Sequence, residues 1–269
     1  MLNDEEKNFD IRNSLFNIQK THCSNNTGML KNLIRTGCQK LMGFDNYLFI
    51  FSLINIALIR ISVYGKEFQY FLSMIPNEGA ILDIGANIGI MTVLLAKKYT
   101  QTTVYAFEPI PQNIRALERV ANHYQLTNVQ IFSTALGNLN GEVKMLMPLV
   151  KYSKMQGLSH VLENLDKREP GEIFSVSMQR MDDMPVLQAL STISAIKVDV
   201  ENFEYFVLQG AQVLLEKHRP IVYSELWNDD RRTLCIELMK HIGYKVKIFR
   251  KGGLVDFTGQ PAVNFFFLP

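Results

Sequence analysis

The sequence of 269 residues is long enough for one large α/β domain, or for one domain with an appendage. Hydrophobic residues make up 47% of it and charged residues 20%, which excludes an intrinsically disordered chain. The net charge of +2 is too small to indicate a nucleic-acid or membrane partner.

The three cysteines, Cys23, Cys38 and Cys235, are scattered and form no Cys-x-x-Cys pair. Such a set indicates free thiols in a reducing compartment and argues against a zinc site. Residues 1–6 are acidic, whereas a secretory signal would be basic and then apolar. We therefore expect a cytoplasmic protein without a bound metal.

The N-terminal part of the chain predicts four helices, at residues 9–20, 29–42, 47–63 and 66–74. The turn Pro-Asn-Glu-Gly follows them, directly before the first expected strand. We expect residues 1–76 to form a helical cap that covers one flank of a sheet.

The most apolar of these helices, residues 47–63, needs weighing as a membrane span. Its uncharged part ends at Arg60, contains Ser52 and Asn55, and is only 13 residues long from Tyr47 to Ile59. A span needs about 20 apolar residues. We interpret it as a docking helix. Peripheral membrane contact is the alternative, because interfacial helices look similar, and it is not expected.

From Gly79 onward the chain alternates strands and helices, so residues 77–269 predict an α/β domain with a mostly parallel sheet and helices on both faces. A hairpin-like pair at the C-terminus would let the last strand insert antiparallel. Residues 148–171 are expected to be irregular. Strands or extended segments are expected at 81–84, 103–107, 129–133, 141–147, 173–178, 193–200, 220–225, 244–249 and 263–268, and helices from 90 and at 113–124, 204–217 and 229–241.

A turn with two glycines, Gly85 and Gly89, joins the first strand to the following helix. Gly85 lacks the Cβ that would keep a cofactor from the backbone, and Gly89 lets the helix lie close to the strand. The free N–H groups of the helix start favour an electron-rich ligand group. An ordinary βα turn is the alternative, because glycines are common in such turns.

Five of the expected strands end at the same edge of the sheet. Acidic side chains lie at the ends of four of these five strands. Ligands of such sheets bind at the carboxyl ends of the strands. This clustering is therefore the informative feature. The acids are Asp83, Glu108, Asp199, Glu201, Glu204 and Glu225.

Glu108 lies 19 residues beyond Gly89, where a carboxylate can accept both hydroxyls of a ribose. Nicotinamide dinucleotides and S-adenosylmethionine are both bound in this way. Asn87 stands where the dinucleotide fingerprint has its second glycine, and Asp83 would repel a pyrophosphate. The same Asp83 carboxylate would favour the positively charged methyl donor. The pattern therefore favours S-adenosylmethionine over a nicotinamide cofactor.

The chain resembles the FkbM family of S-adenosylmethionine-dependent methyltransferases from about residue 82 to residue 244, and again in its last strand. The order and spacing of several motifs carry this resemblance. They are LDIGANIG (82–89), AFEPIP (106–111), ALG (135–137), MDD (181–183), IKVDVE (196–201) with Glu204, Gly210-Ala211, Arg219-Pro220, Glu225, Gly243-Tyr244 and NFFFLP (264–269).

The resemblance implies a class I methyltransferase (Rossmann-like) fold with a mostly parallel seven-stranded sheet. It also implies O-methylation of a hydroxyl on a sugar, glycan, polyketide or other small-molecule acceptor. Asn202 replaces the family's usual glycine. Asparagine tolerates a left-handed backbone, so we expect the turn to persist. The resemblance assigns cofactor binding to Asp83, Gly85, Ala86, Asn87, Gly89, Glu108, Pro109, Ala135 and Leu136.

Asp199 is the first candidate for the base that takes a proton from the acceptor hydroxyl, with Glu201 and Glu225 behind it. Clustered carboxylates raise one another's proton affinity, which suits a base. A divalent cation on the same oxygens is the alternative. For Glu204 we favour a structural role at the start of the next helix.

Two further side chains are weighed as site residues. His160 lies in the irregular stretch, where histidines are usually solvated but can serve as a base. Trp227 follows Glu225, and packing is at least as good an interpretation as stacking on a sugar. The alternative functions are a catalytically silent binding subunit and a nicotinamide-dependent oxidoreductase. No motif specifies the acceptor or the oligomeric state.

Overall fold

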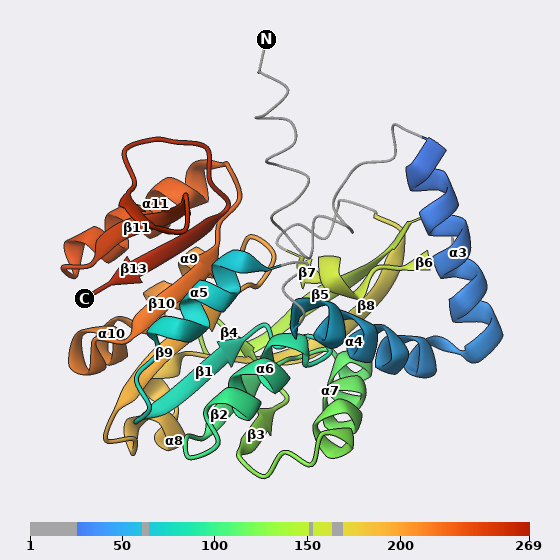
Figure 1. The fold of residues 1–269 in the computed structure, drawn as a ribbon, viewed down its shortest axis with the longest axis horizontal. Helices are drawn as coiled ribbons and strands as arrows, with labels where there is room; N and C mark the ends of the chain where they lie inside the picture. Colours follow the sequence, from blue (N-terminus) through green and yellow to red (C-terminus); the bar gives the residue numbers. More distant parts are fainter. Residues whose placement is uncertain (1–25, 61–64, 151–152, 163–168) are drawn as a thin grey trace.

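The computed structural model describes residues 26–60, 65–150, 153–162 and 169–269, with side chains from residue 33 onward. In this part of the chain a central sheet carries helices on both faces, and a smaller sheet lies beside it (Figure 1). The helix expected at residues 9–20 lies outside the described residues.

The central sheet has eight strands among the described residues, in the order β12-β11-β13-β10-β9-β1-β2-β3. The five from β10 to β3 are parallel, and β13, β11 and β12 are antiparallel to their neighbours. Its strands are β1 (Ala80–Ile84), β2 (Val104–Phe107), β3 (Val129–Phe132), β9 (Ile193–Val198), β10 (Ile221–Glu225), β11 (Lys245–Arg250), β12 (Gly253–Asp256) and β13 (Asn264–Leu268).

The expectation of seven strands was wrong, because β12 adds an eighth at the edge. Lys251 and Gly252 both have positive φ angles, 49° and 86°, and fold the chain back so that Arg250 pairs with Gly253. Two such residues form the tight turn that suits a hairpin. The expected antiparallel insertion of the last strand is confirmed, since Phe265 of β13 pairs with Ser224 of β10.

Alternate residues of the buried strands point into two apolar cores, one on each face of the sheet. Ile81 of β1 packs with α4 (Phe44–Arg60), α5 (Lys66–Met74), α6 (Ile90–Lys98) and α7 (Pro111–His123). Leu82, one residue later, packs on the other face. This face carries α8 (Pro185–Gln188), α9 (Glu204–Gln209), α10 (Gln212–His218) and α11 (Asp230–His241). Helices on both faces explain why β1 and β9 are buried throughout.

The helix α4 docks on α6 and α7, as its apolar sequence predicted. The ring of Phe49 contacts that of His123, and Asp45 forms an ion pair with Arg115 at 3.0 Å. No helix in the described part of the chain is long and apolar enough to cross a membrane. The division of the chain at residue 76 stays a prediction.

The single helix expected at residues 204–217 is divided into α9 and α10. Gly210 lies between them, against the backbone that follows β4 (Ala135–Leu136). A Cβ atom on Gly210 would lie 1.9 Å from the carbonyl oxygen of Gly137. The two segments approach this closely only because residue 210 has no side chain, and the helix is interrupted at the contact.

A second, mostly antiparallel sheet covers the carboxyl ends of the central strands on one side (Figure 1). The segments expected to be extended at 141–147 and 173–178 form its long strands. The stretch expected to be irregular contributes two short strands and a 3₁₀ helix, Gln156–Leu158, among its described residues. The sheet consists of β4, β5 (Gly141–Val150), β6 (Ser153–Lys154), β7 (His160–Val161) and β8 (Gly171–Gln179).

We predict that Gly210→Ala lowers the free energy of unfolding by roughly 2 kcal/mol or more, because the new methyl group overlaps the Gly137 carbonyl. Gly37→Ala is the matched control, since a Cβ at Gly37 meets nothing within 4 Å and alanine favours the helix α3 (Asn26–Met42). Urea unfolding curves of the two variants measure the difference. Equal stability of both variants would contradict the close contact.

Candidate functional site

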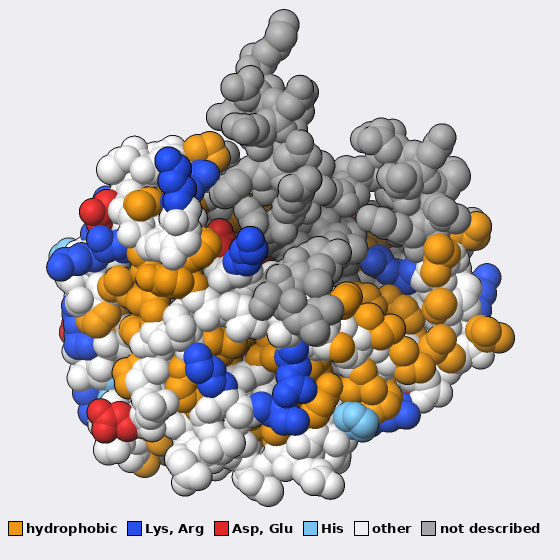
Figure 2. Space-filling model, viewed as in Figure 1, with side chains coloured by type: hydrophobic (Ala, Val, Ile, Leu, Met, Phe, Trp, Pro, Cys, Tyr) orange, Lys and Arg blue, Asp and Glu red, His pale blue; other side chains and the backbone are white. Residues whose placement is uncertain are grey.

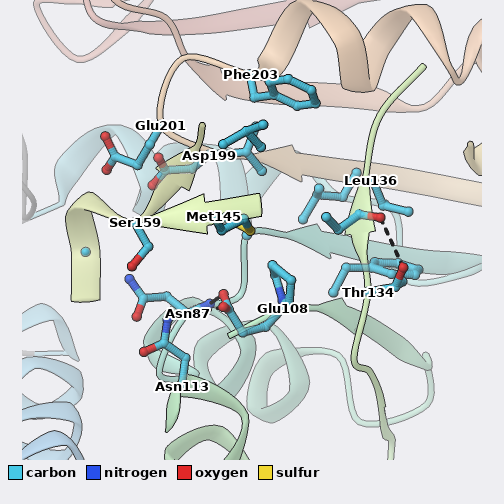
Figure 3. A pocket seen from close by; sticks show the side chains of 18 of the residues that line it. Asn87, Glu108, Asn113, Thr134, Leu136, Met145, Ser159, Asp199, Glu201 and Phe203 are labelled. Carbon is cyan, nitrogen blue, oxygen red and sulfur yellow. Dashed lines mark hydrogen bonds between the residues drawn. The ribbon is translucent and has the colours of Figure 1, made fainter. Parts of the chain in front are cut away.

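A cavity of about 620 Å³, open to solvent, lies at the carboxyl ends of β1, β2 and β9 (Figure 3). Its floor comes from the loops that follow these strands, and its roof from the second sheet and the 3₁₀ helix. Clefts at the carboxyl ends of the strands in such sheets hold cofactors and small ligands. The lining residues are Ile84, Gly85, Asn87, Phe107, Glu108, Pro109, Asn113, Thr134, Ala135, Leu136, Met145, Gln156, Gly157, Ser159, Val161, Asp199, Val200, Glu201 and Phe203.

The turn after β1 lines the cavity through Gly85 and Asn87, whose φ angles are 73° and 50°. A Cβ atom on Gly85 would lie 1.9 Å from the carbonyl oxygen of Asp199. Gly85 is therefore required by the neighbouring segment after β9, a different reason from the ligand access that the sequence suggested. A Cβ on Gly89 would meet Leu117 of α7 at 2.5 Å, so this glycine makes room for α7.

Asp83 is fully buried beneath this turn and does not line the cavity. Its carboxylate accepts a hydrogen bond from Thr92 Oγ1 at 2.6 Å and lies 3.3 Å from Lys197 Nζ. Lys197 Nζ also donates to the carbonyl oxygen of Gly85 at 2.8 Å. Burial lowers the pKa of Lys197, but the Asp83 and Asp199 carboxylates outweigh it and leave this pKa raised. The negative charge of Asp83 is thus matched within the protein, and its direct contact with a cofactor stays a prediction.

Glu108 lies at the end of β2, with its carboxylate in the wall of the cavity (Figure 3). One oxygen accepts from the backbone N–H of Asn87 at 2.9 Å. The other accepts from the N–H of Ile110 at 2.9 Å and from Asn113 Nδ2 at 3.1 Å. Burial raises its pKa to about 7. A carboxylate offers about four acceptor positions, so these three bonds hold Glu108 in place and leave capacity for a ligand hydroxyl.

The loop after β9 brings Asp199 and Glu201 to the opposite wall of the cavity (Figure 3). Glu201 and Asn202 have left-handed backbones, with φ of 52° and 68°. The expectation that Asn202 tolerates this conformation is confirmed. Arg231 Nη1 donates to the Asn202 carbonyl at 2.6 Å, and Glu204 Oε1 accepts from the N–H of Val200 at 3.0 Å. Left-handed residues of this kind persist where their surroundings hold them, often at functional sites.

Glu204 and Glu225 are buried beside this loop, but neither lines the cavity. Burial raises the pKa of Glu204 to about 8, and the carboxylates of Asp199 and Glu225 add to the rise. The raised pKa of Glu204 is thus mainly an effect of burial, to which the neighbouring carboxylates contribute. The structural role of Glu204 is supported by its bond to the Val200 backbone. A direct catalytic role of Glu225 stays a prediction.

Other predicted site residues divide between the cavity and its surroundings. Pro109, Ala135 and Leu136 line the cavity, whereas Ala86 lines a smaller adjoining space of about 310 Å³ with Phe51 and Lys197. Neither His160 nor Trp227 lines the main cavity. The Nδ1 atom of His160 lies 3.0 Å from the carbonyl oxygen of Leu158. Among the described residues, no group of three or more His, Cys, Asp and Glu side chains could hold a metal ion.

Sequence reasoning did not identify the individual residues that form the roof of the cavity. Met145, Gln156 and Ser159 come from the second sheet and its 3₁₀ helix, and no local pattern marks them as site residues. Asn113 could have been identified, because it is the first residue of the helix expected directly after Glu108 and Pro109. In the structure its Nδ2 atom donates a hydrogen bond to Glu108. Phe203, next to the expected acid loop, was also missed.

An adenosyl group suits the lining of this cavity. Leu136, Met145 and Phe203 offer apolar contact to a base, and Glu108 offers an acceptor for ribose hydroxyls. Asp199 and Glu201 add negative charge at the other wall, which suits a positively charged ligand. The residues present thus fit a charged adenosyl cofactor.

The profile of the methyltransferase FkbM domain family matches residues 83–252 of the chain. Among curated proteins, Methyltransferase 1 of Beauveria bassiana (strain ARSEF 2860) is 27% identical over 157 residues, which are 52% of this chain and 61% of that protein. Methyltransferase sdnD of Sordaria araneosa is 28% identical over 188 residues, which are 59% of this chain and 70% of that protein.

The 31-O-demethyl-FK506 methyltransferase FkbM of Streptomyces tacrolimicus is 25% identical over 154 residues, which are 49% of this chain and 59% of that protein. The chain thus spans less than two thirds of the length of two of these three relatives. Among solved structures, methyltransferase FkbM of Methylobacillus flagellatus KT is similar, with a TM-score of 0.47, 18% identity, and coverage of 71% of this chain and 44% of that one.

We predict that Glu204→Gln flattens the dependence of stability on pH. The pKa of Glu204 is raised from 4.5 to about 8, so between these values the unfolded chain loses a proton that the folded chain keeps. The free energy of unfolding therefore falls as the pH rises through this window. Glutamine keeps an acceptor for the Val200 N–H but does not titrate.

Urea unfolding at pH 5 and pH 9 tests this expectation. The variant should match the wild type at pH 5 and exceed it at pH 9, by on the order of 1 kcal/mol or more. Glu216→Gln, on the exposed side of α10, is the control and should leave the pH dependence unchanged. Parallel curves for wild type and Glu204→Gln would contradict the burial of an ionisable Glu204.

Proposed function

The chain belongs to the FkbM methyltransferase family, and from this premise we propose that it transfers a methyl group from S-adenosylmethionine to a hydroxyl of a sugar, glycan or other small-molecule acceptor. The observation that carries the proposal is the convergence of Glu108 and Asp199 on opposite walls of one cavity. A hydrogen-bond acceptor for the ribose of the cofactor and a candidate base for the reaction thus face the same cavity.

The cofactor of the family, S-adenosylmethionine, supplies a methyl group made electrophilic by a positively charged sulfur. We propose that Glu108 accepts its ribose hydroxyls and that Ala135 and Leu136 flank its adenine. The backbone of Gly85 and Asn87 lines the cavity between these walls. Three hydrogen bonds to Glu108 hold its carboxylate in one orientation. Cofactor binding therefore costs little further conformational entropy of this side chain.

Asp199 is the proposed base. Its carboxylate lines the cavity, and its backbone is fixed by the contact with Gly85 and by the bond from its N–H to the Ile84 carbonyl at 3.1 Å. A positioned base that takes the hydroxyl proton during attack contributes about 10²–10⁴-fold to the rate. Glu201, on the same wall, is the second candidate. Glu225 does not line the cavity, so it could contribute to catalysis only indirectly, through the loop that follows β9.

The choice of oxygen as the methyl acceptor is supported by the name of one relative, a 31-O-demethyl-FK506 methyltransferase. It is also supported by the carboxylates of the acceptor wall, because a hydroxyl needs a base, whereas many softer nucleophiles do not. Gln156 and Ser159 of the roof offer hydrogen bonds to a polyhydroxyl compound.

We predict that Glu108→Gln weakens the binding of S-adenosylhomocysteine at least tenfold, which is about 1.4 kcal/mol. Glutamine can keep the bond from the Asn87 N–H but loses the charge that strengthens bonds from ribose hydroxyls. Isothermal titration gives the dissociation constants. Glu118→Gln, an exposed change on α7, is the control. Unchanged affinity in Glu108→Gln would remove Glu108 from the cofactor site.

We predict that Asp199→Asn lowers kcat by about 10²–10⁴-fold and changes the dissociation constant of S-adenosylhomocysteine by less than about threefold. Glu225→Gln is the matched comparison, since Glu225 is buried nearby but does not line the cavity, and it should keep most of the turnover. The assay follows donor consumption with the wild-type protein over pools of hydroxylated acceptors. The two variants are then compared on the acceptor found.

Three outcomes would contradict the proposal in different ways. Full activity of Asp199→Asn would exclude Asp199 as the base. Cofactor binding without turnover on any acceptor would favour a catalytically silent binding subunit. Tighter binding of NAD than of S-adenosylmethionine would favour an oxidoreductase.

A further inference from the structure

The helix α3 packs on the second sheet with its polar side. Thr36 Oγ1 lies 2.6 Å from Ser153 Oγ, and the side chain of Gln39 exchanges two hydrogen bonds with the backbone of Lys154, both at 3.1 Å. Arg35 is also on this side and contacts the sulfur of Met155. An amphipathic helix usually buries its apolar side, whereas α3, among its described side chains, packs only Cys38 and Met42 against the apolar core and turns polar side chains to the second sheet.

Three large apolar side chains of α3 are left in solvent. Leu33 is 68% exposed, Ile34 is 57% exposed and Leu41 is 89% exposed. Their spacing of one, seven and eight residues, together with the exposed Gly37 between them, places them on one face of the helix. Figure 2 shows apolar side chains gathered over this part of the molecule.

The adjacent helix α4 also exposes large apolar side chains. Ile50 and Ile54, one turn apart, are 42% and 53% exposed. The charged residues of α4 are confined to its ends, where Asp45 pairs with Arg115 and Arg60 is exposed. We call the surface formed by Leu33, Ile34, Leu41, Ile50 and Ile54 the α3–α4 apolar face. Large apolar side chains exposed on two neighbouring helices are typical of an interaction surface.

We propose that the α3–α4 apolar face docks on the surface of an anionic lipid bilayer. The charges of α3 are all basic, and the exposed Lys40 borders the apolar side. Apolar side chains beside Lys and Arg are the combination that binds the interface of anionic membranes. The sole acid of the two helices, Asp45, is already paired with Arg115.

A second copy of the chain fits this face less well. A two-fold interface brings the same patch of both copies together, so each residue of the patch lies near the same patch of the other copy. Lys40 and Arg60 of the two copies would then share one interface with no unpaired acid on either α3 or α4. Like charges at an interface are unfavourable, whereas anionic headgroups would neutralise them. Docking on a bilayer surface needs no spanning helix, which agrees with the short length of α4.

The test compares vesicle binding of the full chain and two variants by flotation. Wild-type protein should bind vesicles of phosphatidylcholine and phosphatidylserine, bind pure phosphatidylcholine vesicles more weakly, and lose affinity as salt is raised. The variant Leu33→Gln/Ile34→Gln/Leu41→Gln should bind the mixed vesicles at least tenfold more weakly. The control Leu139→Gln/Val213→Gln removes equally exposed apolar residues elsewhere and should bind as the wild type does.

The proposal is overturned if wild-type protein ignores mixed vesicles, or if the control loses as much affinity as the α3 variant. It is also overturned if sedimentation velocity shows a dimer that the α3 variant abolishes, because a second copy would then cover the face. Melting curves check folding. Ile50→Gln/Ile54→Gln, on α4, is a second variant that should weaken vesicle binding while α3 stays intact. These results do not depend on cofactor binding or turnover.

Discussion

The contact between Gly85 and the carbonyl of Asp199 is the constraint on which the site depends. It holds the end of β1 against the segment after β9 so closely that only glycine fits at residue 85. Lys197 strengthens the same junction, because its Nζ bonds the Gly85 carbonyl and pairs with the buried Asp83. A buried ion pair contributes little net stability, but removal of one partner leaves an uncompensated charge. The pair therefore serves mainly to fix how these two strand ends meet, and this sets the position of the cavity wall that carries Asp199.

The distribution of charge around this junction agrees with a positively charged cofactor. Asp83 forms an ion pair with Lys197 below the turn, and Asp199 also acts on this lysine, so two carboxylates share one ammonium group and negative charge remains at this wall of the cavity. Glu108 is different, because its raised pKa of about 7 follows from burial, and three donors hold it. The cavity thus combines a fixed acceptor on one side with negative charge on the other. A neutral or anionic cofactor would gain less from this arrangement.

The sequence predicted the strands and the acids at their ends because both follow from local patterns. Buried strands read as short apolar runs, and the sheet edge where Glu108, Asp199 and Glu201 lie follows from parallel topology. The requirement for a glycine at residue 85 could not be predicted from local patterns, because it comes from a contact with Asp199, more than a hundred residues away in the sequence. The division of residues 204–217 has the same origin, because Gly210 meets Gly137 only in the folded chain. Contacts between distant backbones leave no periodic signal.

The roof of the cavity and the orientation of α3 were beyond the sequence for a related reason. Periodicity shows that a helix has two sides, but the neighbour decides which side is buried. For α3 this neighbour is β6, whose polar backbone and Ser153 bind Thr36 and Gln39. The N-terminal helices also reach the site itself, because Ser52 of α4 donates to the Ile88 carbonyl at 3.0 Å. The helix that carries Ile50 and Ile54 is therefore bonded on its buried side to the turn that borders the cavity.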